Sequence, residues 1–141
     1  MYPTLKDGNN LIMWQIGYKP QKNDIIVCEN NVGGDGYIIK RCIAVEGDTV
    51  TIDYQKDTVY VNGEEINETY IADSNMEEMF ISDDNYNENH IYEYSIPDNC
   101  VFIMGDNRNV SIDSRSTEVG FVNVNDIKGK ILFNVDDFSF V

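Results

Sequence analysis

The chain has 141 residues, which suffices for one ordinary domain but not for two. Ten basic residues against 25 acidic ones give a net charge of −15, which excludes a sequence-independent grip on nucleic acid phosphates. Apolar residues make up 42% of the chain, enough for a packed core, so we expect a globular domain. No window approaches the roughly 18 apolar residues of a membrane span, so the sequence as written predicts a soluble domain.

Short apolar runs with a period of two predict strands, and no stretch of twelve residues keeps a helical pattern. In chain order the predicted strands are 10–16, 24–29, 37–45, 49–54, 58–61, 91–96, 100–104, 121–124 and 127–135. The Asn62-Gly63 pair is a tight hairpin signal, and Glu46-Gly47-Asp48 closes the longest run. We therefore predict an all-β (mainly β) fold, a closed or partly open barrel-like antiparallel sheet system in a single domain spanning 1–141.

Acidic side chains are concentrated in the middle of the chain. Residues 57–107 carry 13 of the 25 acidic side chains and no Lys or Arg. Because blocks of like charge usually stay in water, we expect a solvated excursion from the sheet at about 67–89. Calcium binding is the sharper alternative, although this run lacks the glycine and spacing of an EF-hand loop. Its oxygen donors would be Asp83, Asp84, Asn85, Asn87 and Glu88.

The three cysteines and the single histidine do not indicate a site. Cys28, Cys42 and Cys100 lie in apolar runs without the spacing of a zinc or redox motif, which predicts buried free thiols. His90 lies in the acidic middle with no candidate nucleophile near it in sequence. We therefore do not expect catalysis that depends on histidine.

A lysine in the longest predicted strand is the first candidate for chemistry. Strand alternation places Lys40 on the face of Ile38 and Cys42, and Ile39 on the other face. Burial would lower the pKa of this amine and leave it neutral, as a lysine general base requires. The alternative is a lysine that reaches solvent or pairs with a carboxylate.

The second candidate is the polar block from Gly105 to Arg115. Its Asp, Asn, Ser and Arg side chains can satisfy their own backbone, which predicts a rigid structural corner. The alternative, functional interpretation is that the loop places a serine hydroxyl beside a catalytic base. The spacing of the block does not choose between these two interpretations.

Together with the start of the chain, these blocks resemble bacterial type I signal peptidases of the small Gram-positive type. Members of that family are membrane-bound serine proteases with a Ser/Lys dyad. The first motif reads Met1-Tyr2-Pro3-Thr4-Leu5, and the second is matched by Lys40, Arg41, Ile43, Gly47 and Asp48. The third, Gly-Asp-Asn-Arg-x-x-Ser-x-Asp-Ser-Arg, is matched at every fixed position from Gly105 to Arg115. Cys42, Ala44 and Glu46 depart from the usual lysine motif, but none of them replaces a catalytic group.

The resemblance implies a role for each candidate residue. Lys40 would be the general base, and Ser111 would orient its amine. Asp113 and Arg115 would form an ion pair that braces the loop, with Asp106 and Arg108 as further scaffold. Shallow pockets for an Ala-x-Ala signal would come from Met1, Leu5, Leu11, Ile38 and Ile39. The implied partner is the signal peptide of an exported preprotein, bound in an extended conformation, and no cofactor or metal is implied.

The family's nucleophile is the serine directly before the motif's Met, and a membrane anchor lies a few residues further upstream. Because the sequence as written starts at that Met, we expect a truncated extracytoplasmic domain of a bacterial cell-membrane enzyme, inactive as written. The alternative is a non-catalytic domain of the same fold that captures signal peptides without cutting them. Contact of Met13 and Trp14 with lipid stays open, since a lone Trp beside a strand also fits a core.

Overall fold

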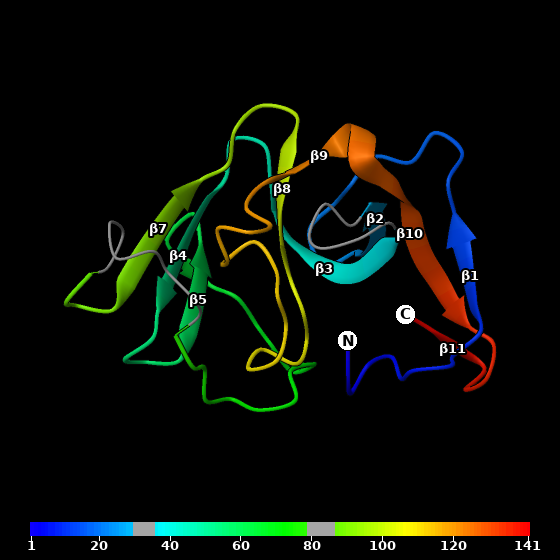
Figure 1. The fold of residues 1–141 in the computed structure, drawn as a ribbon, viewed down its shortest axis with the longest axis horizontal. Helices are drawn as coiled ribbons and strands as arrows, with labels where there is room; N and C mark the ends of the chain where they lie inside the picture. Colours follow the sequence, from blue (N-terminus) through cyan, green and yellow to red (C-terminus); the bar gives the residue numbers. More distant parts are fainter. Residues whose placement is uncertain (30–35, 79–86) are drawn as a thin grey trace.

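The computed structural model describes residues 1–29, 36–78 and 87–141, which fold into two antiparallel sheets (Figure 1). The larger sheet has the strand order β1 (Leu11–Trp14), β10 (Ile127–Asn134), β2 (Ile25–Glu29), β3 (Tyr37–Val45), β8 (Cys100–Met104) and β9 (Val122–Asn123), with β11 (Ser139–Phe140) also paired to β10. The smaller sheet has the order β6 (Glu64–Glu65), β5 (Thr58–Val61), β4 (Thr49–Asp53) and β7 (Ile91–Ser95).

The predicted fold class, mainly β and antiparallel, is confirmed, and the sheets are not closed into a barrel. The helical content of the described ranges includes a 3₁₀ turn, η2 (Val124–Asp126), capped by the side chain of Asn123. Within those ranges we find no helix of the length and apolar character needed to cross a membrane.

Strand β8 lies at the centre of the molecule because it is apolar on both faces. Val101 and Ile103 pack into one core cluster with Cys42, while Phe102 and Met104 pack into a second cluster. A continuous apolar run is the expected pattern for a strand that is covered on both sides. Figure 1 shows β8 between the strands of the smaller sheet and the rest of the larger one.

Strand β3 connects the two sheets and carries the candidate lysine. It pairs with β2 and β8, and the chain then turns at 46–48 into β4 of the smaller sheet. The turn needs Gly47, whose φ is +81°. It is fixed by the carboxylate of Asp48, which accepts hydrogen bonds from the Val45 amide at 3.0 Å and from Asn62 Nδ2 at 2.7 Å.

The sequence predicted three buried free thiols, and it left open whether Trp14 lies in the core. Cys28 and Cys42 are buried free thiols, and Cys100 is a free thiol that is only half-buried. Trp14 contacts the ring of Tyr18, with ring centroids 6.5 Å apart, but it is 47% exposed. It is therefore not a core residue, because β1 is an edge strand with one face open to solvent.

Candidate active site

The strand register explains why Lys40 is half-buried. In the antiparallel pair of β2 and β3, Lys40 lies opposite Ile26, and Ile38 lies opposite Cys28. Ile26 and Cys28 are fully buried in a core cluster that also contains Cys42. The lysine stem therefore runs along an apolar surface.

The Lys40 amine is hydrogen-bonded to the hydroxyl of Ser111. Its Nζ donates to Ser111 Oγ at 2.8 Å, and among the described residues no carboxylate lies within 4 Å of it. Burial lowers the pKa of Lys40, and the positive charge of Arg115 acts in the same direction, whereas Asp113 and Cys28 act against it. The expectation of a lysine paired to a carboxylate does not describe this site.

Ser111 is held in place by the shape of its own loop. Its amide donates to the Asn107 carbonyl at 3.1 Å, and the following turn is attached to β8, where Ser114 Oγ accepts from the Ile103 amide at 2.9 Å. A side chain on Gly105 would overlap the Ser111 side chain and stand 3.6 Å from Lys40 Nζ. Glycine is therefore required at position 105 for Ser111 to approach the lysine.

A fully buried ion pair braces the same loop. Arg115 Nε donates to Asp113 Oδ1 at 2.8 Å, and Arg115 Nη2 donates to Asp113 Oδ2 at 3.0 Å. Both side chains are 0% exposed. Asp113 Oδ2 also accepts from the Gly105 amide at 2.9 Å, which ties the ion pair to the glycine that faces Ser111.

Asp106 and Arg108 each pair with a charged side chain that lies outside the loop. Arg41 donates to Asp106 through Nε at 2.9 Å and Nη2 at 2.7 Å. Arg108 Nη1 donates to Glu68 Oε2 at 3.0 Å, and its Nη2 contacts Glu68 Oε1. Neither ion pair follows from the sequence pattern alone. The available signal was Arg41 itself, a charged residue in a mostly apolar strand that requires a counter-charge.

The start of the chain lies next to the lysine. Burial lowers the pKa of the Met1 amino group, the charge of Lys40 also lowers it, and Asp106 acts against both. Met1, Leu11 and Ile39 pack around the buried side chain of Leu5 in a third core cluster.

The structure does not bring all five predicted pocket residues together. Ile38 projects from the face of β3 that also carries Lys40, opposite to the face of Ile39. On that face it packs with the cluster that contains Cys42. The strand alternation that separates Ile38 from Ile39 accounts for this.

The acidic middle is only partly the solvated excursion that its charge predicts. Most side chains at 68–78 are exposed, but Met76 is buried in the core and the Glu68 side chain is 9% exposed. His90 Nδ1 lies 2.7 Å from Glu78 Oε2, far in sequence from the lysine site. Glu68 is buried, unlike most of this segment, because it pairs with the buried guanidinium of Arg108.

Metal binding has no geometric support in the part of the chain that the structure describes. Within it, no group of three His, Cys, Asp or Glu side chains is arranged to hold an ion. Asp83, Asp84 and Asn85, three of the predicted calcium donors, lie outside the described residues.

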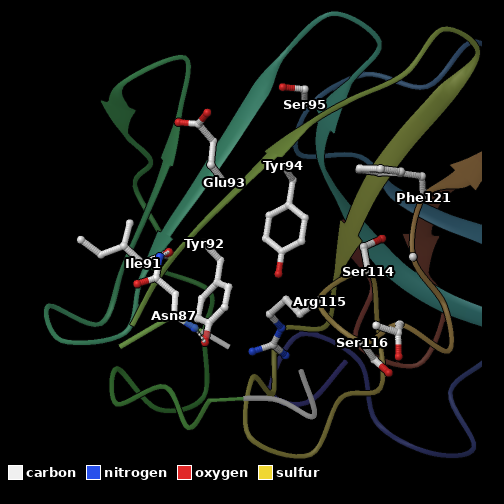
Figure 2. Close-up of a pocket in the computed structure, with 12 residues that line it drawn as sticks. Asn87, Ile91, Tyr92, Glu93, Tyr94, Ser95, Ser114, Arg115, Ser116 and Phe121 are labelled. Atoms are coloured by element: carbon white, nitrogen blue, oxygen red, sulfur yellow. Dashed lines mark hydrogen bonds between the residues drawn. The ribbon is translucent and has the colours of Figure 1, made fainter. Parts of the chain in front are cut away.

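The far side of the bracing loop borders a cavity of about 540 Å³ between β7 and residues 114–121 (Figure 2). Its lining includes Tyr92, Tyr94, Ser114, Arg115, Ser116 and Phe121, but neither Lys40 nor Ser111. Arg115 therefore borders this cavity and also pairs with Asp113.

Comparisons with known proteins agree with this geometry. The sequence matches the family described as signal peptidase, peptidase S26, over residues 1–135. Signal peptidase I of Bacillus caldolyticus is 36% identical over 144 residues, which cover 99% of this chain and 76% of that protein. Signal peptidase IB of Staphylococcus aureus strain Mu50 is 36% identical over 148 residues, which cover 99% of this chain and 74% of that protein.

Among solved structures, that of a signal peptidase I from Enterococcus faecalis V583 is similar. It superposes with a TM-score of 0.59 at 30% sequence identity, over 80% of this chain and 97% of that one. Fold and sequence together thus define a peptidase. The chain belongs to the signal peptidase family, peptidase S26.

Proposed function

We propose that this chain is the catalytic domain of a signal peptidase I, an endopeptidase that removes signal peptides with a Ser/Lys dyad. One observation carries the proposal. Lys40 presents a half-buried amine with a lowered pKa to Ser111, with no carboxylate beside it in the described ranges and with the Met1 nitrogen nearby. A neutral amine in such a place can accept the proton of a hydroxyl.

The nucleophile in this proposal is a serine bonded to the Met1 nitrogen in the full-length protein. Lys40 takes the proton from its hydroxyl while the oxygen attacks the scissile carbonyl of the substrate. The protonated lysine then gives that proton to the leaving amine of the mature protein, and an acyl-enzyme is left. Lys40 next takes a proton from water as that water attacks the ester carbonyl. It then gives this proton to the serine oxygen as the ester bond breaks, which frees the signal peptide with a new carboxylate and restores the neutral lysine. Ser111 acts by fixing the direction of the lysine lone pair.

The substrate pockets are proposed from the apolar side chains around Leu5. Met1, Leu11 and Ile39 contact this cluster and are only half-buried, so they offer apolar surface to a ligand. Shallow apolar surface suits small side chains such as those of an Ala-x-Ala signal. An extended substrate would bind mainly through its backbone along a strand edge.

The test is cleavage of a preprotein with an Ala-x-Ala site by protein that carries a serine directly before Met1. We expect cleavage after the second alanine, and no cleavage when alanine replaces that serine or when the protein begins at Met1. Binding of the substrate without cleavage by the serine protein would support the non-catalytic domain instead. Cleavage by the alanine variant at the parent rate would rule out the serine as nucleophile.

We further propose that the domain works at the outer face of the bacterial cell membrane with its β1 and β11 side toward lipid. Ile16 is 88% exposed and Phe140 is 87% exposed, and Ile12, Trp14 and Phe138 are also exposed on these segments. Because the net charge of −15 is repelled by anionic lipid, attachment must come from apolar contact and an anchor.

Flotation with zwitterionic vesicles measures this contact. We expect the domain to bind such vesicles better than anionic ones, and the double variant Ile16→Ser with Phe140→Ser to lose binding. The control is Thr117→Ser, a substitution at an exposed residue away from this face. Equal vesicle binding by the double variant and the parent would contradict the assignment of this face.

A further inference from the structure

Residues 68–72, here called the latch, lie in the acidic middle of the chain and pack against the lysine site. Three of the latch residues make the contacts. Glu68 pairs with Arg108, the ring of Tyr70 covers Arg41, and the Ala72 amide donates to the Asp106 carbonyl at 3.0 Å. The latch thus contacts β3 and the 105–115 loop at once.

The contact of Glu68 fixes the middle of the 105–115 loop. Both Glu68 oxygens accept from the Arg108 guanidinium, and the two side chains are 9% and 1% exposed. Arg108 Nε also donates to the Gly105 carbonyl at 3.1 Å, and the Arg108 carbonyl accepts from Arg115 Nη2 at 2.6 Å. Such a two-point pair has one favoured geometry, so it restricts where this loop can lie.

The contact of Tyr70 leads to the start of the chain. Arg41 Cζ lies 3.8 Å from the centre of the Tyr70 ring, a cation–π contact. Arg41 holds Asp106 through two nitrogens, and Thr4 Oγ1 donates to Asp106 Oδ2. Thr4 is three residues after Met1, which packs against the same core cluster as Ile39, the neighbour of Lys40 in β3.

From these contacts we infer that the latch is a positioning element, which holds the Met1–Leu5 segment at a fixed place relative to Lys40. Glu68 and Tyr70 are its positioning residues. The inference rests on the proposed function and adds to it the device that sets the distance between nucleophile and base. A serine and a lysine that exchange a proton must be held within about 0.5 Å of the productive geometry. A displacement of about 1 Å can cost roughly 100-fold in rate.

The test uses the full-length enzyme with the variants Tyr70→Leu, Tyr70→Phe and Glu68→Gln. Glu64→Gln and Glu65→Gln, exposed on β6, serve as charge-matched controls. We expect Tyr70→Leu and Glu68→Gln to lower kcat by about 10- to 100-fold with KM changed by less than about twofold. Tyr70→Phe keeps the ring over Arg41 and should retain most of the activity, and the two controls should match the parent.

Hydrogen exchange of the same proteins separates positioning from stability. In Tyr70→Leu we expect faster exchange at the Leu5 amide, which donates to Met1, and at the Ser111 amide, which donates to Asn107. The Asn62 amide, bonded to Thr49 in the smaller sheet, should exchange as in the parent.

Two results would overturn the latch. One is parent-like kcat in Tyr70→Leu, and the other is uniform loss of protection that includes Asn62, which would mark a purely structural residue. An inactive parent would instead refute the proposed function, and exchange at Leu5 and Ser111 would still decide whether the latch fixes these segments.

Discussion

Replacing Lys40 with alanine in protein that carries the proposed serine before Met1 is expected to lower kcat by about 10⁴-fold or more. A serine hydroxyl is a weak nucleophile at neutral pH and needs a base within hydrogen-bond reach. The structure places the Lys40 amine beside Ser111, and Met1 packs against the same core cluster as the neighbouring Ile39. The measurement is the single-turnover rate of preprotein cleavage, with substrate binding followed separately.

Two substitutions at the same position separate charge from basicity. Lys40→Arg keeps a positive charge but cannot become neutral, and Lys40→Met keeps the apolar stem. Both are expected to be as inactive as the alanine variant. Lys128→Ala is the matched control, because Lys128 is a half-exposed lysine of β10 paired with Glu29. Full activity in any Lys40 variant would refute the proposed dyad.

The lowered pKa of Lys40 also fixes the direction of the pH dependence. Only the neutral amine accepts a proton, so kcat/KM should rise with pH as Lys40 loses its proton, below the ordinary lysine range. Between its folded and unfolded pKa values the unfolded chain binds more protons, so this group makes stability rise with pH. At neutral pH Lys40→Met should therefore unfold at a higher temperature than the parent while being inactive.

Local sequence pattern predicted the strands that bury a clear apolar face. The segments 37–45, 58–61 and 100–104 have the same bounds in the structure as in the prediction. Strands β6 and β11 were missed, because each has two residues that become strands only by pairing with a neighbour. Closure into a barrel could not be judged, because strand pattern does not say which edges pair.

The site was predictable to the extent that it depends on alternation and on motif resemblance. Alternation put Lys40 on the apolar face of β3, and the resemblance pointed to Ser111 as its neighbour. Neither could find Glu68, because by composition it is one of 13 acidic residues between positions 57 and 107 and lies in the predicted solvated excursion. Only the folded chain shows that this carboxylate faces the buried Arg108.

Replacing Asp113 with asparagine is expected to lower the free energy of unfolding by about 3–5 kcal/mol. The substitution keeps the size of the side chain but leaves Arg115, which is 0% exposed, without its counter-charge. Burial alone would lower the pKa of Arg115, but Asp113 and Tyr54 together outweigh burial and raise it. Chemical denaturation of the parent and variant measures the loss.

The same substitution should also disturb the lysine site. Asp113 accepts from the Gly105 amide, and Gly105 stands directly against Ser111, so a shift of this carboxylate changes the hydroxyl that Lys40 contacts. In a double-mutant cycle with Arg115→Met the two stability losses should not add, because the single variants share one interaction. Lys128→Gln removes an ion pair at the surface and should leave stability unchanged within error. Additive losses, or an Asp113→Asn protein as stable as the parent, would show that the pair does not brace the loop.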